Sequence, residues 1–191
     1  MKPKFYKKVL NNGMTVIFEK RELPVVSFAL SVRAGGVNES EKEKGISHFI
    51  EHMLYKGTKK RTTRQIAEEI EKRGGELNGF TSEEITAFWC KIPSEHFGIA
   101  LDVISDAVKN PLFNEEEFQK EKKVILEEVK LYRDSPMRYV FNEIKNNLYS
   151  SPVGIDIIGT VKSINSITRE QIVKKYKEFY SRIFEGMENI G

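Results

Sequence analysis

Strand and helix signals are segregated along this chain, and their order constrains the fold more than any other sequence feature. Every strand-like run lies before residue 93, and most of the segments with helical periodicity follow it. Asn12-Gly13, between two strand-like runs, is a strong hairpin signal. This order favours an α+β domain in which helices cover one face of a mostly antiparallel sheet.

The predicted elements follow from turn and capping residues between the periodic runs. The predicted strands are Tyr6–Leu10, Met14–Glu19, Val25–Val32, Glu76–Thr81 and Ile85–Ile92, of which Val25–Val32 reads as a buried strand. A capping box at Ser40–Glu43 is predicted to open the first helix. The other predicted helices are Thr62–Arg73, Ser94–Asn110, Glu115–Asp134, Pro136–Tyr149 and Arg169–Tyr180, with N-caps at Ser94, Asn114, Ser135 and Thr168 for the last four.

Composition narrows the class of protein. The 31 basic and 28 acidic side chains nearly cancel to a net charge of +3, which gives no reason to expect nucleic-acid binding. Hydrophobic residues make up 39% of the 191 residues without a long apolar run, so no transmembrane helix and no membrane association are expected. The start has no apolar stretch of the signal-peptide type. The single cysteine, Cys90, is expected in a buried strand and suits a reducing cytoplasm.

The segment Gly45–Met53 contains three side chains of types that occur in zinc sites, namely His48, Glu51 and His52. At about 100° per residue, a helix places the two histidines one turn apart with the glutamate beside them, as two imidazole ligands of one zinc ion require. The order His-x-x-Glu-His is the reverse of the commoner zinc-protease order and is the inverzincin signature. A chance pattern on a solvated helix is the alternative, and a third ligand would decide between the two.

The segment 114–134 supplies candidates for that ligand. Its apolar residues recur with helical spacing, and Glu121 and Glu128 fall in the middle of the apolar stripe. An ionised carboxylate in an apolar setting costs several kcal/mol unless a positive partner meets it, which favours a metal ion. Pairing with Lys or Arg, or contact with water, is the alternative. The stripe comprises Phe118, Val124, Ile125, Val129, Leu131 and Tyr132.

From about residue 10 to residue 180, these motifs resemble the M16 metallopeptidases, the group of pitrilysin, insulinase and the mitochondrial processing peptidase. Residues 45–58 resemble the zinc helix of that family, and residues 126–136 resemble the segment that carries its third ligand. The resemblance selects Glu128 as that third ligand and implies that Glu121, two turns upstream, matters for activity. The implied set is therefore Zn²⁺ bound by His48, His52 and Glu128, with Glu51 as general base and Glu121 as an auxiliary catalytic residue.

Residues 74–82 resemble the active-site edge strand of the family, to which the substrate backbone adds as a further strand. The resemblance implies substrate binding by Asn78, Gly79 and Phe80, although the family usually has Ala after the Asn. Gly74-Gly75 also predicts a helix C-cap that leads into an ordinary strand, and both interpretations can hold together.

The resemblance also sets expectations for the end of the chain. In the family, an aromatic pair such as Phe179-Tyr180 is followed by an apolar strand that completes the sheet and then by a second domain of similar fold. Residues 181–191 lack that pattern. We therefore expect one zinc-peptidase domain at 1–180, an atypical tail at 181–191, no closing strand and no second half.

The predicted function is zinc-dependent endopeptidase activity on unstructured peptides or extended segments, in the cytoplasm. A rival from another class is a non-catalytic zinc-binding or M16-like subunit, or a peptide-binding half, that needs a partner chain. A homodimer or a second M16-type half could be that partner, because an unfilled sheet edge invites pairing with another chain.

Overall fold

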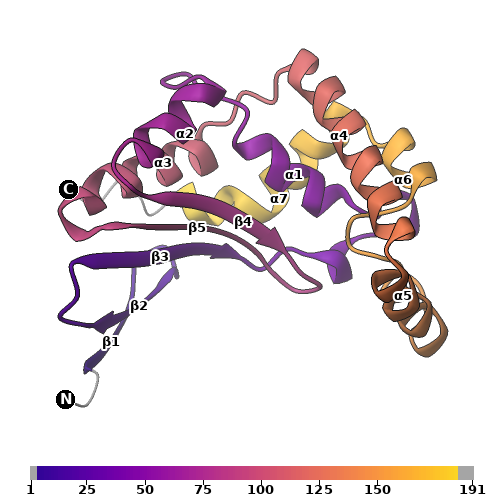
Figure 1. Cartoon of the computed structure of the whole chain (residues 1–191), viewed down its shortest axis with the longest axis horizontal. Helices are drawn as coiled ribbons and strands as arrows, with labels where there is room; N and C mark the ends of the chain where they lie inside the picture. Colours follow the sequence, from indigo (N-terminus) through magenta and orange to yellow (C-terminus); the bar gives the residue numbers. More distant parts are fainter. Residues whose placement is uncertain (1–3, 185–191) are drawn as a thin grey trace.

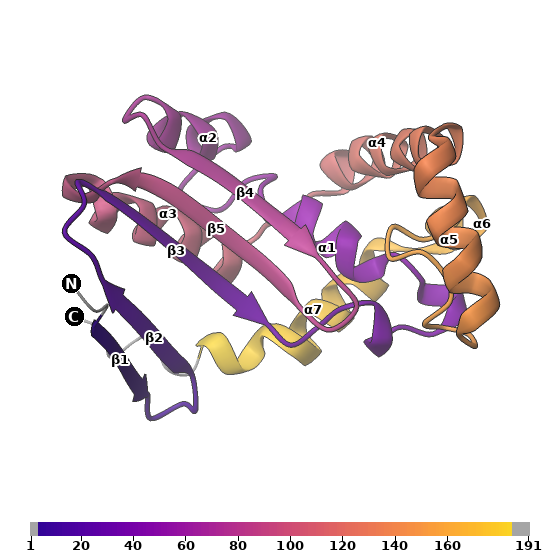
Figure 2. The same ribbon diagram turned by 60° about the horizontal axis from the view of Figure 1, so that its bottom comes forward.

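A computed structural model describes residues 4–184 of the chain. Helices form a layer over a small antiparallel sheet, and a separate hairpin lies beyond the strand of residues 25–32 (Figures 1 and 2). Residues 181–184 of the predicted tail continue the last helix, and residues 185–191 lie outside the described residues. The strands are β1 (Lys4–Val9), β2 (Thr15–Lys20), β3 (Val25–Val32), β4 (Glu76–Thr81) and β5 (Thr86–Pro93). The helices are α1 (Ile46–Leu54), α2 (Thr63–Glu71), α3 (Phe97–Lys109), α4 (Glu115–Asp134), α5 (Pro136–Leu148), α6 (Val161–Ser166) and α7 (Arg169–Phe184).

The main sheet has the strand order β3-β5-β4, so β5 is central and β4 is an edge strand within residues 4–184. Both pairings are antiparallel, and Thr86 of β5 lies opposite both Val32 of β3 and Thr81 of β4. The predicted hairpin is confirmed as a separate antiparallel pair, β1–β2, closed by hydrogen bonds between Leu10 and Met14 and between Gly13 and Leu10. The predicted α+β class is therefore confirmed.

The helices α1, α2, α3 and α7 lie on one face of the sheet, and α4, α5 and α6 gather at one end of the molecule (Figures 1 and 2). Helix α1 contacts β4, β5, α4 and α7 and is therefore enclosed on several sides. Its Phe49 ring stacks on Phe118 of α4 with the ring centroids 4.9 Å apart, and both side chains are buried. No helix within residues 4–184 has the length and apolar character needed to cross a membrane.

Two predictions about the first half of the chain are wrong. Strand β3 is buried only at its last residue, Val32; its other residues alternate between exposed and partly buried positions, and it pairs only with β5 in the described part of the chain. The Ser40–Glu43 capping box does not form, because the Ser40 hydroxyl donates to Glu43 Oε2 at 2.9 Å and caps no backbone N–H. Ser40 instead precedes a short 3₁₀ turn at Glu41–Glu43, which a backbone hydrogen bond from Glu43 to Ser40 closes. Helix α1 begins three residues later, at Ile46.

The second half also departs from prediction in places. Helix α4 has the predicted bounds and the predicted Asn114 cap, but Val124 and Leu131 of the expected stripe are exposed. Its buried residues are Phe118, Glu121, Ile125 and Val129, a narrower stripe that faces its neighbours α1 and α6. Thr168 accepts a hydrogen bond from the Gln171 N–H as predicted, whereas Ser94 and Ser135 make no side-chain cap. Helix α6 was not predicted.

Candidate metal centre

Helix α1 carries the histidine motif and is fixed in place by its own apolar face. The side chains of Ile46, Phe49, Ile50, Met53 and Leu54 are at most 2% exposed, as the helical periodicity predicted. Because this face is buried, helix α1 cannot rotate about its axis, and the opposite side of the helix, which carries the histidines, is directed toward α4. The orientation of the two imidazoles therefore follows from the packing of the helix.

The start of α1 is held by a residue that sequence analysis did not single out. The buried Glu39 carboxylate accepts hydrogen bonds from the Gly45 N–H at 3.0 Å and from the Ser47 N–H at 2.8 Å. Negative charge at a helix N-terminus is stabilising, and these bonds satisfy two of its free donors. Gly45 has φ +94°, and a Cβ there would lie 2.7 Å from the Ile158 carbonyl oxygen, so this approach to the helix requires glycine.

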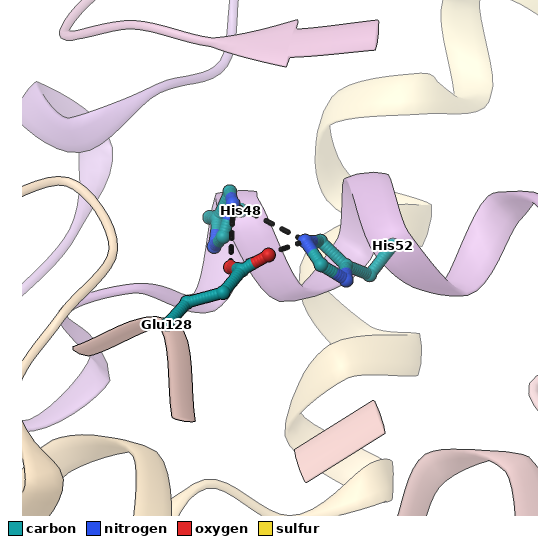
Figure 3. A group of neighbouring side chains, drawn as sticks. All are labelled: His48, His52 and Glu128. Carbon is teal, nitrogen blue, oxygen red and sulfur yellow. Dashed lines mark hydrogen bonds and ion pairs between the residues drawn. The ribbon is translucent and has the colours of Figure 1, made fainter. Parts of the chain in front are cut away.

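Three predicted metal-binding side chains converge in the structure (Figure 3). The Nε2 atoms of His48 and His52 lie 3.2 Å apart, and Glu128 Oε2 lies 3.7 Å from each of them. All three donor atoms lie within 4.8 Å of one another. The histidines come from α1 and the glutamate from α4, so residues that are 76 and 80 positions apart in the sequence meet at one point.

This arrangement fits a zinc ion on its donor chemistry. Ligand atoms about 2.1 Å from a tetrahedral zinc lie roughly 3.4 Å from one another, close to the three separations found here. Burial, reinforced by the neighbouring His52, lowers the pKa of His48 to about 3, so that its imidazole is neutral and its lone pair is available at pH 7. No Lys or Arg forms an ion pair with Glu128 within residues 4–184, which leaves this carboxylate without a fixed cation.

Glu121 has a different environment, although it lies on the same stripe of α4. It is 5% exposed, its Oε2 accepts a hydrogen bond from His52 Nδ1 at 3.0 Å, and its Oε1 lies 2.6 Å from Lys56 Nζ. Burial alone would raise the pKa of Glu121, but the hydrogen bonds from His52 and Lys56 outweigh it and lower the pKa. Glu121 therefore pairs with a lysine, which was the alternative to a metal ion in the sequence analysis. An ionised Glu121 fixes the proton of His52 on Nδ1 and leaves Nε2 free toward Glu128.

Glu51 points from α1 to the sheet. Its Oε2 accepts a 2.6 Å hydrogen bond from the Thr81 hydroxyl at the end of β4. Burial raises the pKa of Glu51, and the hydrogen bond from Thr81 and the nearby His52 offset only part of that shift. A carboxylate with a raised pKa beside a candidate metal site is suited to accept a proton during a reaction near neutral pH.

The three predicted substrate-binding residues lie on edge strand β4 but face opposite ways. Asn78 and Phe80 are exposed, with 46% of Phe80 accessible, whereas Gly79 faces Glu51. A Cβ on Gly79 would lie 2.9 Å from Glu51 Oε1 and 3.0 Å from Tyr55 Oη. The Gly79 N–H donates to Asn78 Oδ1 at 2.8 Å, so the side chain of Asn78 occupies one donor of the strand.

Sequence analysis missed the residues that support this site: Glu39, Lys56 and Thr81. Each of them acts through a tertiary contact. The sequence indicated them only as polar residues that lie in or beside a motif. Lys56 stands directly after the zinc-type motif, and Thr81 ends the predicted edge strand. Neither the spacing nor the periodicity shows which glutamate each of them meets.

Comparisons with known proteins identify the family of this chain. The sequence matches the family described as Insulinase (Peptidase family M16) over residues 15–161. It is 36% identical over 183 residues to an uncharacterized zinc protease of Rickettsia felis, a match that covers 95% of this chain and 44% of that protein. It is 38% identical over 174 residues to the mitochondrial-processing peptidase subunit beta of Dictyostelium discoideum, covering 90% of this chain and 37% of that protein.

A solved structure of a protease from Helicobacter pylori has a TM-score of 0.88 and 26% identity, and the match covers 93% of this chain and 44% of that one. The chain thus spans less than half the length of these relatives. The family match covers most of this chain, and the sequence identity to the Rickettsia felis protein extends over 95% of it. The chain therefore belongs to the insulinase family, peptidase family M16.

Proposed function

We propose that this chain forms the metal-binding half of a zinc-dependent endopeptidase, with His48, His52 and Glu128 as the ligands of Zn²⁺. The observation that carries the proposal is the approach of their three donor atoms to within 3.2–3.7 Å of one another. Three protein ligands with a fourth position open are typical of catalytic zinc sites. When bound, zinc acts as a Lewis acid that makes a water molecule nucleophilic near neutral pH.

The other residues of the site have separate tasks. Glu51 accepts the proton of the attacking water and passes it to the amine nitrogen of the leaving peptide. Glu121 holds His52 in the tautomer whose Nε2 is free, and Lys56 pairs with the other carboxylate oxygen of Glu121. These roles assign one function to each of the charged groups that surround the two histidines.

The substrate in this proposal is an extended peptide that adds to the open edge of β4. Main-chain hydrogen bonds to an edge strand select for extended backbone, which favours unfolded peptides and flexible segments over folded proteins. The Asn78 side chain would have to release the Gly79 N–H before a substrate carbonyl could accept from it. Phe80 and Asn78 face away from Glu51, so they would act through the backbone of the strand or on the outer face.

A partner chain belongs to the proposal as an alternative. The chain covers only 37% of a relative that is named a subunit, and β3 has an open edge within residues 4–184. Catalysis would then require a second M16-type half or a second copy of this chain. Without such a partner, the chain would bind zinc and peptide and hydrolyse nothing.

The test combines zinc content with cleavage of an unstructured peptide library by the full chain at several protein concentrations. We expect one zinc per chain, cleavage by the wild type, and loss of cleavage in Glu51→Gln with zinc retained. Glu127→Gln is the matched control, because Glu127 is exposed on α4 and, among residues 4–184, forms an ion pair only with Lys130. Full cleavage by zinc-loaded Glu51→Gln would refute the role of Glu51. Activity that rises faster than protein concentration would identify the partner as a second copy, and stoichiometric zinc without any cleavage would favour the binding subunit.

A further inference from the structure

We propose that Thr81 is a positioning residue that fixes the carboxylate of Glu51, so that strand β4 aligns the general base as well as the substrate. The inference rests on the proposed function. Its basis is a buried hydrogen bond between the two side chains, which connects α1 to the end of β4 across 30 residues of sequence. No other hydroxyl within residues 4–184 donates to Glu51 in the structure.

The direction of the hydrogen bond follows from the neighbouring groups. Thr86 lies opposite Thr81 on β5 and donates its own proton to the Ala34 carbonyl oxygen at 2.8 Å. The Thr81 hydroxyl therefore has two possible acceptors, Thr86 Oγ1 at 3.5 Å and Glu51 Oε2 at 2.6 Å. The carboxylate is both closer and charged, so it takes the proton of Thr81.

The second oxygen of Glu51 is kept free by the same strand. Gly79 lies two residues before Thr81 on the same face of β4, and an added Cβ would come within 2.9 Å of Glu51 Oε1. Thr81 thus holds Oε2 while the lack of a side chain at position 79 leaves Oε1 unobstructed. Oε1 is the oxygen that this arrangement assigns to proton transfer.

One rigid strand then sets the relative position of the base and of the substrate backbone. Every residue of β4 is in register with β5, so the strand cannot shift locally without breaking that pairing. Misplacement of a reacting group by about 1 Å can reduce a rate by about a hundredfold. Loss of the Thr81 hydroxyl should therefore lower kcat, and KM should change little because the edge of the strand stays intact.

Two substitutions at this position separate the hydroxyl from the side-chain shape. Thr81→Val keeps the branched shape and removes the donor, and Thr81→Ser keeps the donor. We expect Thr81→Val to lower kcat by tenfold or more with KM within twofold and zinc content unchanged, and Thr81→Ser to recover most of the loss. Thr86→Val is the comparison variant: it removes a buried hydroxyl that lies 3.5 Å from Thr81 Oγ1 but donates to the Ala34 carbonyl oxygen, so its kcat should stay closer to that of the wild type than the kcat of Thr81→Val.

A measurement without turnover tests the same contact. In a double-mutant cycle on the zinc-free chain, Thr81→Val and Glu51→Met should shift the urea midpoint of unfolding non-additively. Additive shifts would overturn the inference, as would a Thr81→Val enzyme with wild-type kcat, or a Thr81→Ser enzyme as slow as Thr81→Val. Absence of cleavage by the wild type would refute the proposed activity, and the cycle would still report whether Thr81 holds Glu51.

Discussion

Replacement of Glu121 by glutamine tests how the second glutamate of α4 contributes to the metal centre. In the wild type, each carboxylate oxygen of Glu121 has its own donor, His52 Nδ1 at 3.0 Å and Lys56 Nζ at 2.6 Å. A glutamine offers one oxygen and one NH₂ group, so one of these two donors must face another donor. Lys56 is partly exposed and can turn to water, and we expect the amide oxygen to remain with His52.

The magnitude follows from the kind of hydrogen bond that His52 keeps. A hydrogen bond to a charged group contributes about 1.5–3 kcal/mol and a neutral one about 0.5–1.5 kcal/mol. The difference of roughly 1–1.5 kcal/mol corresponds to about a tenfold change in an equilibrium constant. It agrees with the loss of about 10- to 100-fold in metal affinity that follows removal of a group behind a histidine ligand. Glu121→Gln should therefore weaken zinc binding about tenfold.

The assay is competition for zinc with a chromophoric chelator at pH 7, on the wild type, Glu121→Gln, Lys56→Met and the exposed control Glu127→Gln. Lys56→Met keeps the bond from His52 to Glu121 and removes a positive charge near the centre, so its zinc affinity should not fall. A zinc Kd for Glu121→Gln within twofold of the wild type would refute the reasoning. An equal loss in Lys56→Met would show that the lysine, and not the bond to His52, matters.

Two further predictions concern the surroundings of the site. Gly79→Ala should lower kcat about tenfold because its methyl group displaces Glu51, and adding Tyr55→Phe should recover part of the loss; an unchanged kcat would contradict this. Asp106 is buried, and burial alone would raise the pKa of its carboxyl group. Hydrogen bonds from groups including Arg61 outweigh burial and lower that pKa below the usual 3.8. The ionised carboxylate therefore stabilises the folded chain fully above about pH 4, and this contribution is lost as the pH falls through the lowered pKa. Asp106→Asn should therefore reduce the urea midpoint more at pH 7 than at pH 2, and equal reductions at both pH values would contradict the assignment.

The parts of the fold that rest on local periodicity could be predicted from the sequence. Helix α4 has its predicted bounds because a capping residue and a long apolar repeat define it without reference to neighbours. The buried face of α1 could be predicted for the same reason. The start of α1 could not, because the Ser40–Glu43 pattern precedes only a 3₁₀ turn and forms no capping box, while the helix itself is capped by Glu39 from outside the motif.

The exposure of β3 shows a second limit. Its residues are β-branched and apolar enough to suggest a buried strand, yet burial depends on what lies on each face and edge, and β3 has a partner only on one side within residues 4–184. Val124 and Leu131 of α4 were misjudged for the same reason. Amphipathic patterns indicate which residues could be buried, and only the tertiary arrangement decides which of them are.

The different roles of the two glutamates of α4 also could not be predicted from the residues alone. They follow from the shape of the imidazole ring. Seven residues of helix separate Glu121 from Glu128, about 10 Å along the axis, and both point in nearly the same direction. The two ring nitrogens of His52 face opposite ways, so two such carboxylates can approach one ring from its two sides. Glu121 reaches Nδ1, and Glu128 reaches the Nε2 side that His48 shares. A single helix can thereby supply a ligand and the group that orients another ligand, provided that it crosses α1 at His52.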